Sequence, residues 1–182
     1  WFLNVYIEIF RGTPMIVQSM VIYYGSAQAF GISIDRTIAA IFIVSINTGA
    51  YMSEIVRGGI FAVDKGQFEA ATALGMTHGQ TMRKIVLPQV IRNILPATGN
   101  EFVINIKDTS VLNVISVVEL YFSGNTIATQ TYKYFQTFTI IAVIYFVLTF
   151  TVTRILRYVE HRFDTDSYTT GANQMQTGEL KP

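Results

Sequence analysis

The sequence contains no cysteine and has few charged residues for its length. Only 14% of its 182 residues are charged and 51% are hydrophobic, whereas soluble domains carry about 25% charged residues. The absence of cysteine excludes a disulfide framework, a thiolate metal site and a cysteine nucleophile. The composition therefore predicts an all-α, polytopic membrane protein that lies in membrane lipid.

Other missing patterns exclude further classes of function. The net charge of +1, with no interleaved basic and aromatic pattern, argues against a nucleic-acid partner. There is no Ser, His and Asp set, glycine-rich phosphate loop or paired carboxylate motif, so we expect no catalytic residue and no cofactor on this chain, ATP included. His78 and His161 have no second ligand at metal spacing, so we expect no metal site.

Long apolar runs are present instead. A membrane-spanning helix needs about 20 residues to cross a hydrocarbon core of about 30 Å. Four stretches approach or exceed that length, residues 14–30, 37–56, 91–120 and 135–156. The sequence therefore predicts four spans within residues 1–163. Residues 164–182 are polar, and we expect them to form a separate flexible cytoplasmic tail.

The third predicted span is irregular. Its helix-breaking, polar and charged residues are Pro96, Gly99, Asn100, Glu101, Lys107 and Asp108. Such residues at membrane depth must be covered by protein or water. We therefore expect a broken helix here rather than a straight one facing lipid.

The positions of Lys and Arg predict the orientation. Arg11 precedes the first predicted span, and most other basic residues follow the second and fourth. Only Arg36 and Lys133 lie in the alternate loops. Because basic loops remain cytoplasmic, the C-terminus should lie inside.

A polar segment, residues 69–88, separates the second and third predicted spans. Residues 67–74 are good helix formers, and Gly75 fits a left-handed helix cap. Thr77 and Gln80 have capping-box spacing and predict a second helix that runs to Leu87, with Pro88 after it. An ordinary ordered loop is the alternative that these signals leave open.

Several motifs that follow one another along the chain favour a specific structure over an ordinary ordered loop. They are Glu69-Ala-Ala with Gly75 and Leu87-Pro88, Tyr6-Ile-Glu-Ile-Phe-Arg-Gly-Thr-Pro14, Gly49-Ala-Tyr-Met-Ser-Glu-Ile-Val-Arg-Gly-Gly59, Lys65-Gly-Gln67, Lys107-Asp-Thr-Ser110 and Glu119-Leu120. Residues 5–162 resemble permease subunits of bacterial polar amino acid ABC importers, the branch for histidine, glutamine, arginine or glutamate. The polar segment matches the EAA loop of that family.

The resemblance implies a type I ABC importer permease fold in the bacterial cell membrane. The residues that it implies for coupling to an ATPase are Glu69, Ala70, Ala71, Gly75, Leu87 and Pro88. It also implies a second permease subunit, two cytoplasmic ATP-binding subunits that bind ATP and Mg²⁺, and an extracytoplasmic substrate-binding protein. The family's first span has no counterpart here, so we expect Trp1 to lie within a longer chain.

Ionisable residues at membrane depth usually face a cavity or a partner. Asp108 is a candidate for binding the ammonium group of an amino acid, and Lys107 for its carboxylate. The other candidates for the substrate pathway are Thr109, Ser110, Asn105 and Asn100. A structural role between helices is the alternative for each of them.

Two pairs of oppositely charged residues are spaced so that each could form an ion pair within one helix. Glu54 with Arg57, and Glu8 with Arg11, are three residues apart, which predicts intrahelical pairs. Gly12-Thr13-Pro14 predicts a break between a surface helix and the first predicted span. Two rival functions remain: an ion-coupled secondary carrier, which needs no EAA loop, and an intramembrane enzyme, which needs catalytic groups that are not seen.

Overall fold

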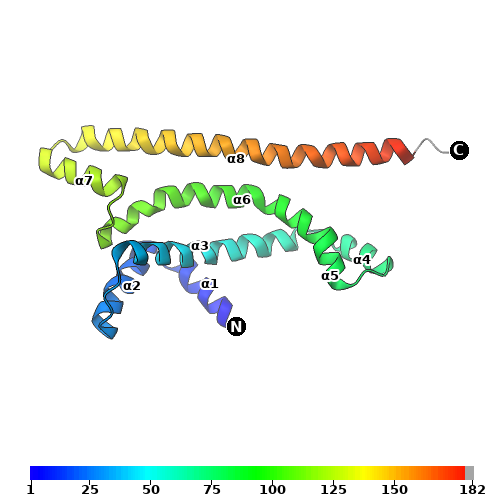
Figure 1. The fold of residues 1–182 in the computed structure, drawn as a ribbon, viewed down its shortest axis with the longest axis horizontal. Helices are drawn as coiled ribbons and strands as arrows, with labels where there is room; N and C mark the ends of the chain where they lie inside the picture. Colours follow the sequence, from blue (N-terminus) through cyan, green and yellow to red (C-terminus); the bar gives the residue numbers. More distant parts are fainter. Residues whose placement is uncertain (179–182) are drawn as a thin grey trace. The chain divides into compact units, whose positions relative to one another are not determined.

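The computed structural model describes residues 1–178, and the side chains of residues 1–162 within them. Its regular elements are all helical (Figure 1), which confirms the predicted all-α class. The α-helices are α1 (Phe2–Gly12), α2 (Met15–Phe30), α3 (Arg36–Phe61), α4 (Lys65–Ala73), α5 (His78–Thr81), α6 (Leu87–Asp108), α7 (Leu120–Thr131) and α8 (Tyr134–Gly178). A π-helical turn, η1 (Met82–Val86), and a 3₁₀ segment, η2 (Thr109–Ile115), complete the set.

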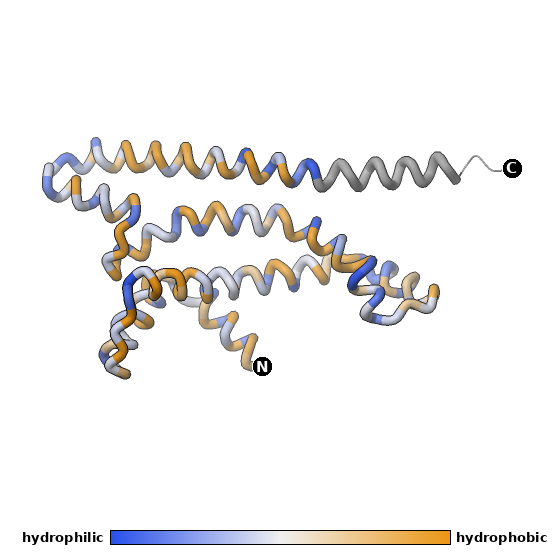
Figure 2. The backbone as a smooth tube through the Cα atoms, in the orientation of Figure 1, coloured by the Kyte–Doolittle hydropathy of each residue, from blue (hydrophilic) through white to orange (hydrophobic). Residues whose placement is uncertain are grey.

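Two helices of the described part are long and apolar enough to cross a membrane. They are α3 and the Tyr134–Arg162 part of α8, which match the predicted spans 37–56 and 135–156. Figure 2 shows hydrophobic residues along most of this part of α8. A third span is possible if the bent pair His78–Ile115 and Leu120–Thr131 counts as one.

The prediction of four spans is therefore corrected to two, or three with the bent pair. The stretch 14–30 forms α2, which has 16 residues and is about 24 Å long at 1.5 Å per residue, short of a hydrocarbon core of about 30 Å. Pro14 precedes its first turn, and Gly31 ends it in a left-handed conformation with φ +67°. These two residues set its length.

The predicted break in the third span is present, but it lies later than Pro96. Helix α6 continues through Pro96 to Asp108 and passes into η2, where Ser116 adopts φ +61°. The chain then enters α7 after a bend of 54°. The stretch 91–120 is thus a helix, a tighter turn and an extended link rather than one kinked helix.

The described chain forms two compact units. One consists of Trp1–Glu54 and Asn100–Thr151, and the other of Ile55–Gly99 and the residues from Val152 onward. The core of the first unit joins Ala39, Ala40 and Ile43 of α3 to Leu112 and Ile115 of η2. Partly buried residues of α2 pack against it, so α2, α3 and η2 are held by one apolar cluster.

Buried amides join α1, α2 and α3 in the first unit. Gln18 Nε2 donates to the carbonyls of Phe10, at 2.9 Å, and Thr13, at 2.8 Å. Asn47 Nδ2 donates to Gln18 Oε1 at 2.9 Å, and both side chains are buried. The predicted break at Gly12-Thr13-Pro14 is confirmed, and Gln18 satisfies carbonyls that the end of α1 leaves open.

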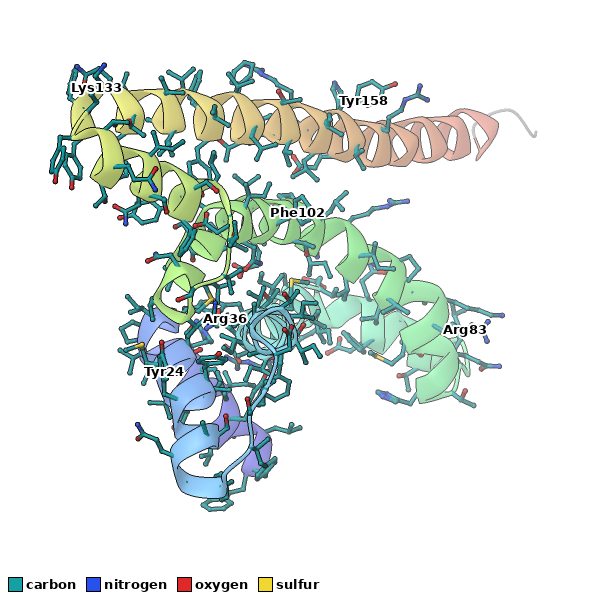
Figure 3. The ribbon with its side chains drawn as sticks, turned by 60° about the vertical axis from the view of Figure 1, so that its left-hand side comes forward. Tyr24, Arg36, Arg83, Phe102, Lys133 and Tyr158 are labelled. Atoms are coloured by element: carbon teal, nitrogen blue, oxygen red, sulfur yellow. The ribbon has the colours of Figure 1, made fainter. Side chains whose placement is uncertain are left out.

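Helices α7 and α8 of the first unit pack closely. Glu119 caps α7 by accepting from the backbone N–H groups of Tyr121 and Phe122, and it also accepts from the Tyr145 hydroxyl of α8 at 3.1 Å. A Cβ at Gly124 would lie 1.9 Å from Ile141 Cδ1, so a larger residue there would require the Ile141 side chain to move. Lys133 lies in the exposed turn between the two helices (Figure 3).

The core of the second unit is smaller. Val63, Val86 and Val90 are buried together, with Ile60, Phe68, Met82 and Ile94 packed around them. A Cβ at Gly59 would lie 2.2 Å from Ile94 Cγ2, so α3 approaches α6 closely here. The predicted tail, residues 164–182, lies outside the residues whose side chains are described and stays a prediction.

Candidate functional site

The polar segment folds as a helix, a turn and a helix. The Asp64 carboxylate caps α4 by accepting from the Gly66 N–H at 2.7 Å. At the other end of α4 the N–H of Met76 donates to the Ala71 carbonyl and that of Gly75 to the Thr72 carbonyl. This is a Schellman closure. Gly75 has φ +73°, so the predicted left-handed cap is confirmed.

The second helix of the polar segment begins as predicted but ends elsewhere. Thr77 and Gln80 form both hydrogen bonds of a capping box. The predicted stop before Pro88 is wrong, because Pro88 is the second residue of α6 and the helix continues. The turn η1 lies directly before it. A wide π turn accommodates the missing proline N–H and its clash with the carbonyl of Lys84 four residues earlier.

The side chains of the polar segment divide into a buried and an exposed set. Ala71 is buried, whereas Glu69, Ala70 and Gly75 are exposed. Leu74 is 80% exposed at the end of α4. A protruding apolar residue of this kind at a helix turn is suited to contact with a protein partner.

The start of the next helix adds exposed side chains. Leu87 and Pro88 are exposed at the beginning of α6, and the basic side chains of Arg83 and Lys84 on η1 are exposed as well. Arg83 extends away from the helix (Figure 3). The six residues of the predicted coupling set therefore lie on α4, its cap and the start of α6, with only Ala71 inside.

Three polar residues of α6 lie on one face, and we call them the α6 stripe: Glu101, Asn105 and Asp108. Their spacing of four and three residues places them within about 60° of one another around the helix. Glu101 is buried and Asp108 is exposed in the single chain. Carboxylates and an amide in this order can bind a ligand that carries both an ammonium and a carboxylate group.

Asn105 has a partner on another helix. Thr48 of α3 lies 3.1 Å from it, measured from Thr48 Oγ1 to Asn105 Oδ1. Sequence reasoning missed Thr48, because a pair separated by 57 positions leaves no local signal. It also missed Glu101 as a candidate for the pathway, although its spacing of seven residues from Asp108 on a helix indicated a shared face.

The other predicted pathway residues do not join the α6 stripe. Lys107 is exposed and lies about 100° around the helix from Asp108. Thr109 Oγ1 donates to the Ile106 carbonyl at 3.0 Å, and the Ser110 carbonyl accepts from Asn113 Nδ2 at 2.6 Å. Both residues support the start of η2.

An ion pair connects α1 to α3. Arg11 Nη1 lies 3.2 Å from Glu54 Oε2, and the Arg11 guanidinium lies over the ring of Tyr51. The partner of Arg11 is therefore on another helix, which spacing along one helix does not indicate. The predicted pairs of Glu54 with Arg57 and of Glu8 with Arg11 stay predictions.

Within the part of the chain that the structure describes, no group of three or more His, Cys, Asp or Glu side chains is placed to hold a metal ion. His78 begins α5 and His161 lies on α8.

Comparison with known proteins gives relatives along most of the chain. Residues 1–165 match the family described as binding-protein-dependent transport system inner membrane component. The arginine transport system permease protein of Bacillus subtilis strain 168 is 40% identical over 162 residues, which are 89% of this chain and 74% of that protein. The glutamine transport system permease protein of Escherichia coli K12 is 41% identical over 159 residues, 87% and 73% of the two chains.

Solved structures agree with these relatives. A chain described as "Crystal structure of an amino acid ABC transporter with histidines" is 46% identical, with a TM-score of 0.82 over 87% of this chain and 74% of that one. A methionine ABC transporter in an inward-facing conformation shares the fold alone, with 19% identity and a TM-score of 0.71 over 88% and 73% of the chains. The chain therefore belongs to the binding-protein-dependent transport inner membrane family, as a membrane permease subunit of the amino acid ABC transporter type and not an enzyme.

Proposed function

We propose that this subunit imports polar amino acids into the cytoplasm. It works with a second permease subunit, two cytoplasmic ATP-binding subunits and an extracytoplasmic substrate-binding protein. ATP and Mg²⁺ bind to the ATP-binding subunits. The names of relatives 40% and 41% identical, which transport arginine and glutamine, support this class of substrate.

The observation that supports the proposal is the ordered and exposed surface of the polar segment. Two capped helices carry the exposed Glu69 within α4 and the exposed Leu74 and Gly75 at the turn that follows it. An ion-coupled carrier needs no such surface, whereas a permease driven by an ATPase needs a docking surface for it. The six predicted coupling residues lie in this segment, and Ala71 is the buried one among them.

A continuous helix connects this surface to the proposed pathway. Helix α6 begins at Leu87, in the polar segment, and ends at Asp108. Movement of the docked ATPase subunits is therefore transmitted along α6 to the α6 stripe. Helices are stiff enough to carry such a displacement between sites.

The α6 stripe is the proposed contact for the amino acid. Asp108 binds the α-ammonium group, since an exposed carboxylate at membrane depth needs a cationic partner. Lys107, Thr109 and Ser110 contribute less directly, because the last two already bond within η2 and at its junction with α6.

The orientation follows from the distribution of basic residues. The polar segment and the C-terminus face the cytoplasm, and the turn at Lys133 faces outward. The protein then lies in the bacterial cell membrane with its ATPase-docking surface on the side where ATP is available.

Uptake by the reconstituted complex tests the proposal. Vesicles that contain both permease subunits and the ATP-binding subunits, with binding protein on the substrate side, are given radiolabelled arginine, glutamine, glutamate and histidine. We expect ATP-dependent accumulation of at least one of them. Accumulation that needs an ion gradient instead of ATP, or none with any of the four, would contradict the proposed function.

A further inference from the structure

We propose that Thr48 is a positioning residue that turns the Asn105 amide so that its NH₂ group faces the pathway and binds the carboxylate of the transported amino acid. This inference rests on the proposed function, since it names the part of the substrate that one member of the α6 stripe recognises. It begins with the bond between Thr48 Oγ1 and Asn105 Oδ1, which is 3.1 Å long.

The bond fixes which end of the amide is free. A threonine hydroxyl can donate to the amide oxygen, and the amide nitrogen, on the opposite side of the same plane, then points away from Thr48. No residue within the described part of the chain is hydrogen-bonded to Asn105 Nδ2, and Asn105 is only half-buried. Two N–H donors are therefore available to a ligand.

Thr48 is itself held in place. The preceding residue, Asn47, is buried and donates to Gln18 Oε1 at 2.9 Å and to the Phe10 carbonyl at 3.4 Å. These bonds fix the rotation of α3 at this level, and Thr48 faces α6 as a result. The hydroxyl is thus supported by a rigid network rather than by a mobile loop.

The chemistry of the α6 stripe gives the ligand group. Glu101 and Asp108 are acceptors when ionised and suit cations, so the stripe needs a donor for the other charge of a zwitterion. Asn105 supplies that donor one turn from Asp108. The amide NH₂ offers two N–H donors, either of which can donate to a carboxylate oxygen, and the amide is neutral, so it adds no cation beside the two acids.

The test measures recognition of the carboxylate in the purified permease–ATPase complex. For whichever of arginine, glutamine, glutamate and histidine is taken up best, equilibrium dialysis gives the Kd of the amino acid and of its α-carboxamide. We expect the wild type to prefer the amino acid. Thr48→Val, which removes the hydroxyl at constant shape, should reduce this preference by about 5- to 10-fold, the value of one hydrogen bond.

Matched variants separate positioning from structure. Thr48→Ser keeps the hydroxyl and should keep the preference. Thr126→Val on α7 removes a hydroxyl that bonds only its own helix, to the Phe122 carbonyl, and should also change nothing. A Thr48→Val complex with unchanged preference, or a Thr48→Ser complex as defective as Thr48→Val, would overturn the inference.

A second substitution keeps the test decisive if Thr48→Val does not assemble. Asn105→Asp retains an acceptor for Thr48 but replaces the NH₂ group by a carboxylate oxygen. It should weaken binding of the amino acid at least 10-fold more than binding of the carboxamide, and equal weakening of both would overturn the inference. If the wild-type complex binds no polar amino acid, the proposed function fails first, and this inference falls with it.

Discussion

At the scale of single residues, Gly75 has a backbone conformation that few side chains tolerate. Its φ is +73°, yet a Cβ added there would meet no atom within 4 Å. The requirement is therefore conformational rather than one of space. A β-branched residue in the left-handed region costs about 1–2 kcal/mol or more, whereas asparagine tolerates it.

We predict that Gly75→Val disturbs the turn of the polar segment and uncouples ATP hydrolysis from uptake or loosens the ATPase subunit. Gly75→Asn is the matched control and should retain both. The measurements are uptake, ATPase activity and co-purification of the ATPase subunit. Normal values for Gly75→Val in all three would show that the conformation of this residue is unimportant for coupling.

A second prediction at this scale concerns Asp108. Asp108→Asn keeps the shape of the side chain but loses a charge-assisted bond to an α-ammonium group, worth about 1.5–3 kcal/mol, or roughly 10- to more than 100-fold in affinity. Assembly should survive, because Asp108 is exposed in the single chain. The measurements are substrate affinity and thermal stability with and without substrate.

The alternative for Asp108 gives a different result. If its carboxylate only neutralises a nearby cation, Asp108→Asn lowers the stability of the complex whether or not substrate is present. Wild-type affinity in a stable Asp108→Asn complex would remove Asp108 from the pathway.

The sequence predicts residues whose partners lie within a few positions. Thr77 and Gln80 are three apart, and the capping box follows from that spacing alone. The position of Gly75 after a run of helix formers is equally local. Thr48 and Asn105 are far apart in the sequence and meet only because α3 packs beside α6, so no spacing rule finds them.

At the scale of elements, Gln18 holds α1, α2 and α3 together. Its amide nitrogen donates to carbonyls at the end of α1, and its oxygen accepts from Asn47. We predict that Gln18→Leu, which leaves these buried groups unpaired, destabilises the protein by about 1–3 kcal/mol. The exposed Gln28 on α2 provides the control Gln28→Leu.

Thermal denaturation of the detergent-purified complex measures this effect. Gln18→Leu should lower the midpoint clearly, and Gln28→Leu should leave it near the wild-type value. Equal midpoints for Gln18→Leu and wild type would show that water replaces the amide at no cost.

The ends of the elements show where sequence patterns are insufficient. Pro88 is a reasonable stop signal, yet the helix continues because η1 widens the turn before it. The break in the third predicted span lies after Asp108, and α6 continues as an α-helix through Pro96. Both outcomes depend on backbone accommodation, which residue propensities do not describe.

At the scale of the whole molecule, the orientation in the membrane can be tested with single cysteines, because the chain has none of its own. Cysteines at Gln28 and Ser123 should react with an impermeant thiol reagent added outside the cell. Cysteines at Gln80 and His161 should react only after the membrane is opened. All four positions are exposed in the single chain, so burial within it does not prevent labelling.

The labelling pattern has two contrary outcomes. Reaction at Gln80 and His161 alone in intact cells would invert the proposed orientation. Reaction at all four sites would instead contradict the assignment of α3 and α8 as spans.

Class and family could be predicted for the whole molecule from composition and ordered motifs, because both are summed over many residues. The number of membrane spans could not be predicted in this way. Residues 14–30 are apolar enough, but Pro14 and Gly31 confine α2 to 16 residues. Hydropathy measures the transfer of side chains to lipid, and it contains no information on where a proline or a glycine ends a helix.

The π turn at η1 is equivalent to an α-helix with one extra residue inserted. The second unit's core contains four side chains spaced four residues apart, those of Met82, Val86, Val90 and Ile94. A regular α-helix completes one turn every 3.6 residues, so side chains at this spacing drift around it. The inserted residue absorbs part of that drift. Deletion of one residue within η1 would restore a regular helix and rotate α5 by about 100° around the helix axis relative to α6. The length of this short turn therefore sets the direction in which the surface proposed for ATPase docking faces relative to α6, independently of any contact that the surface makes.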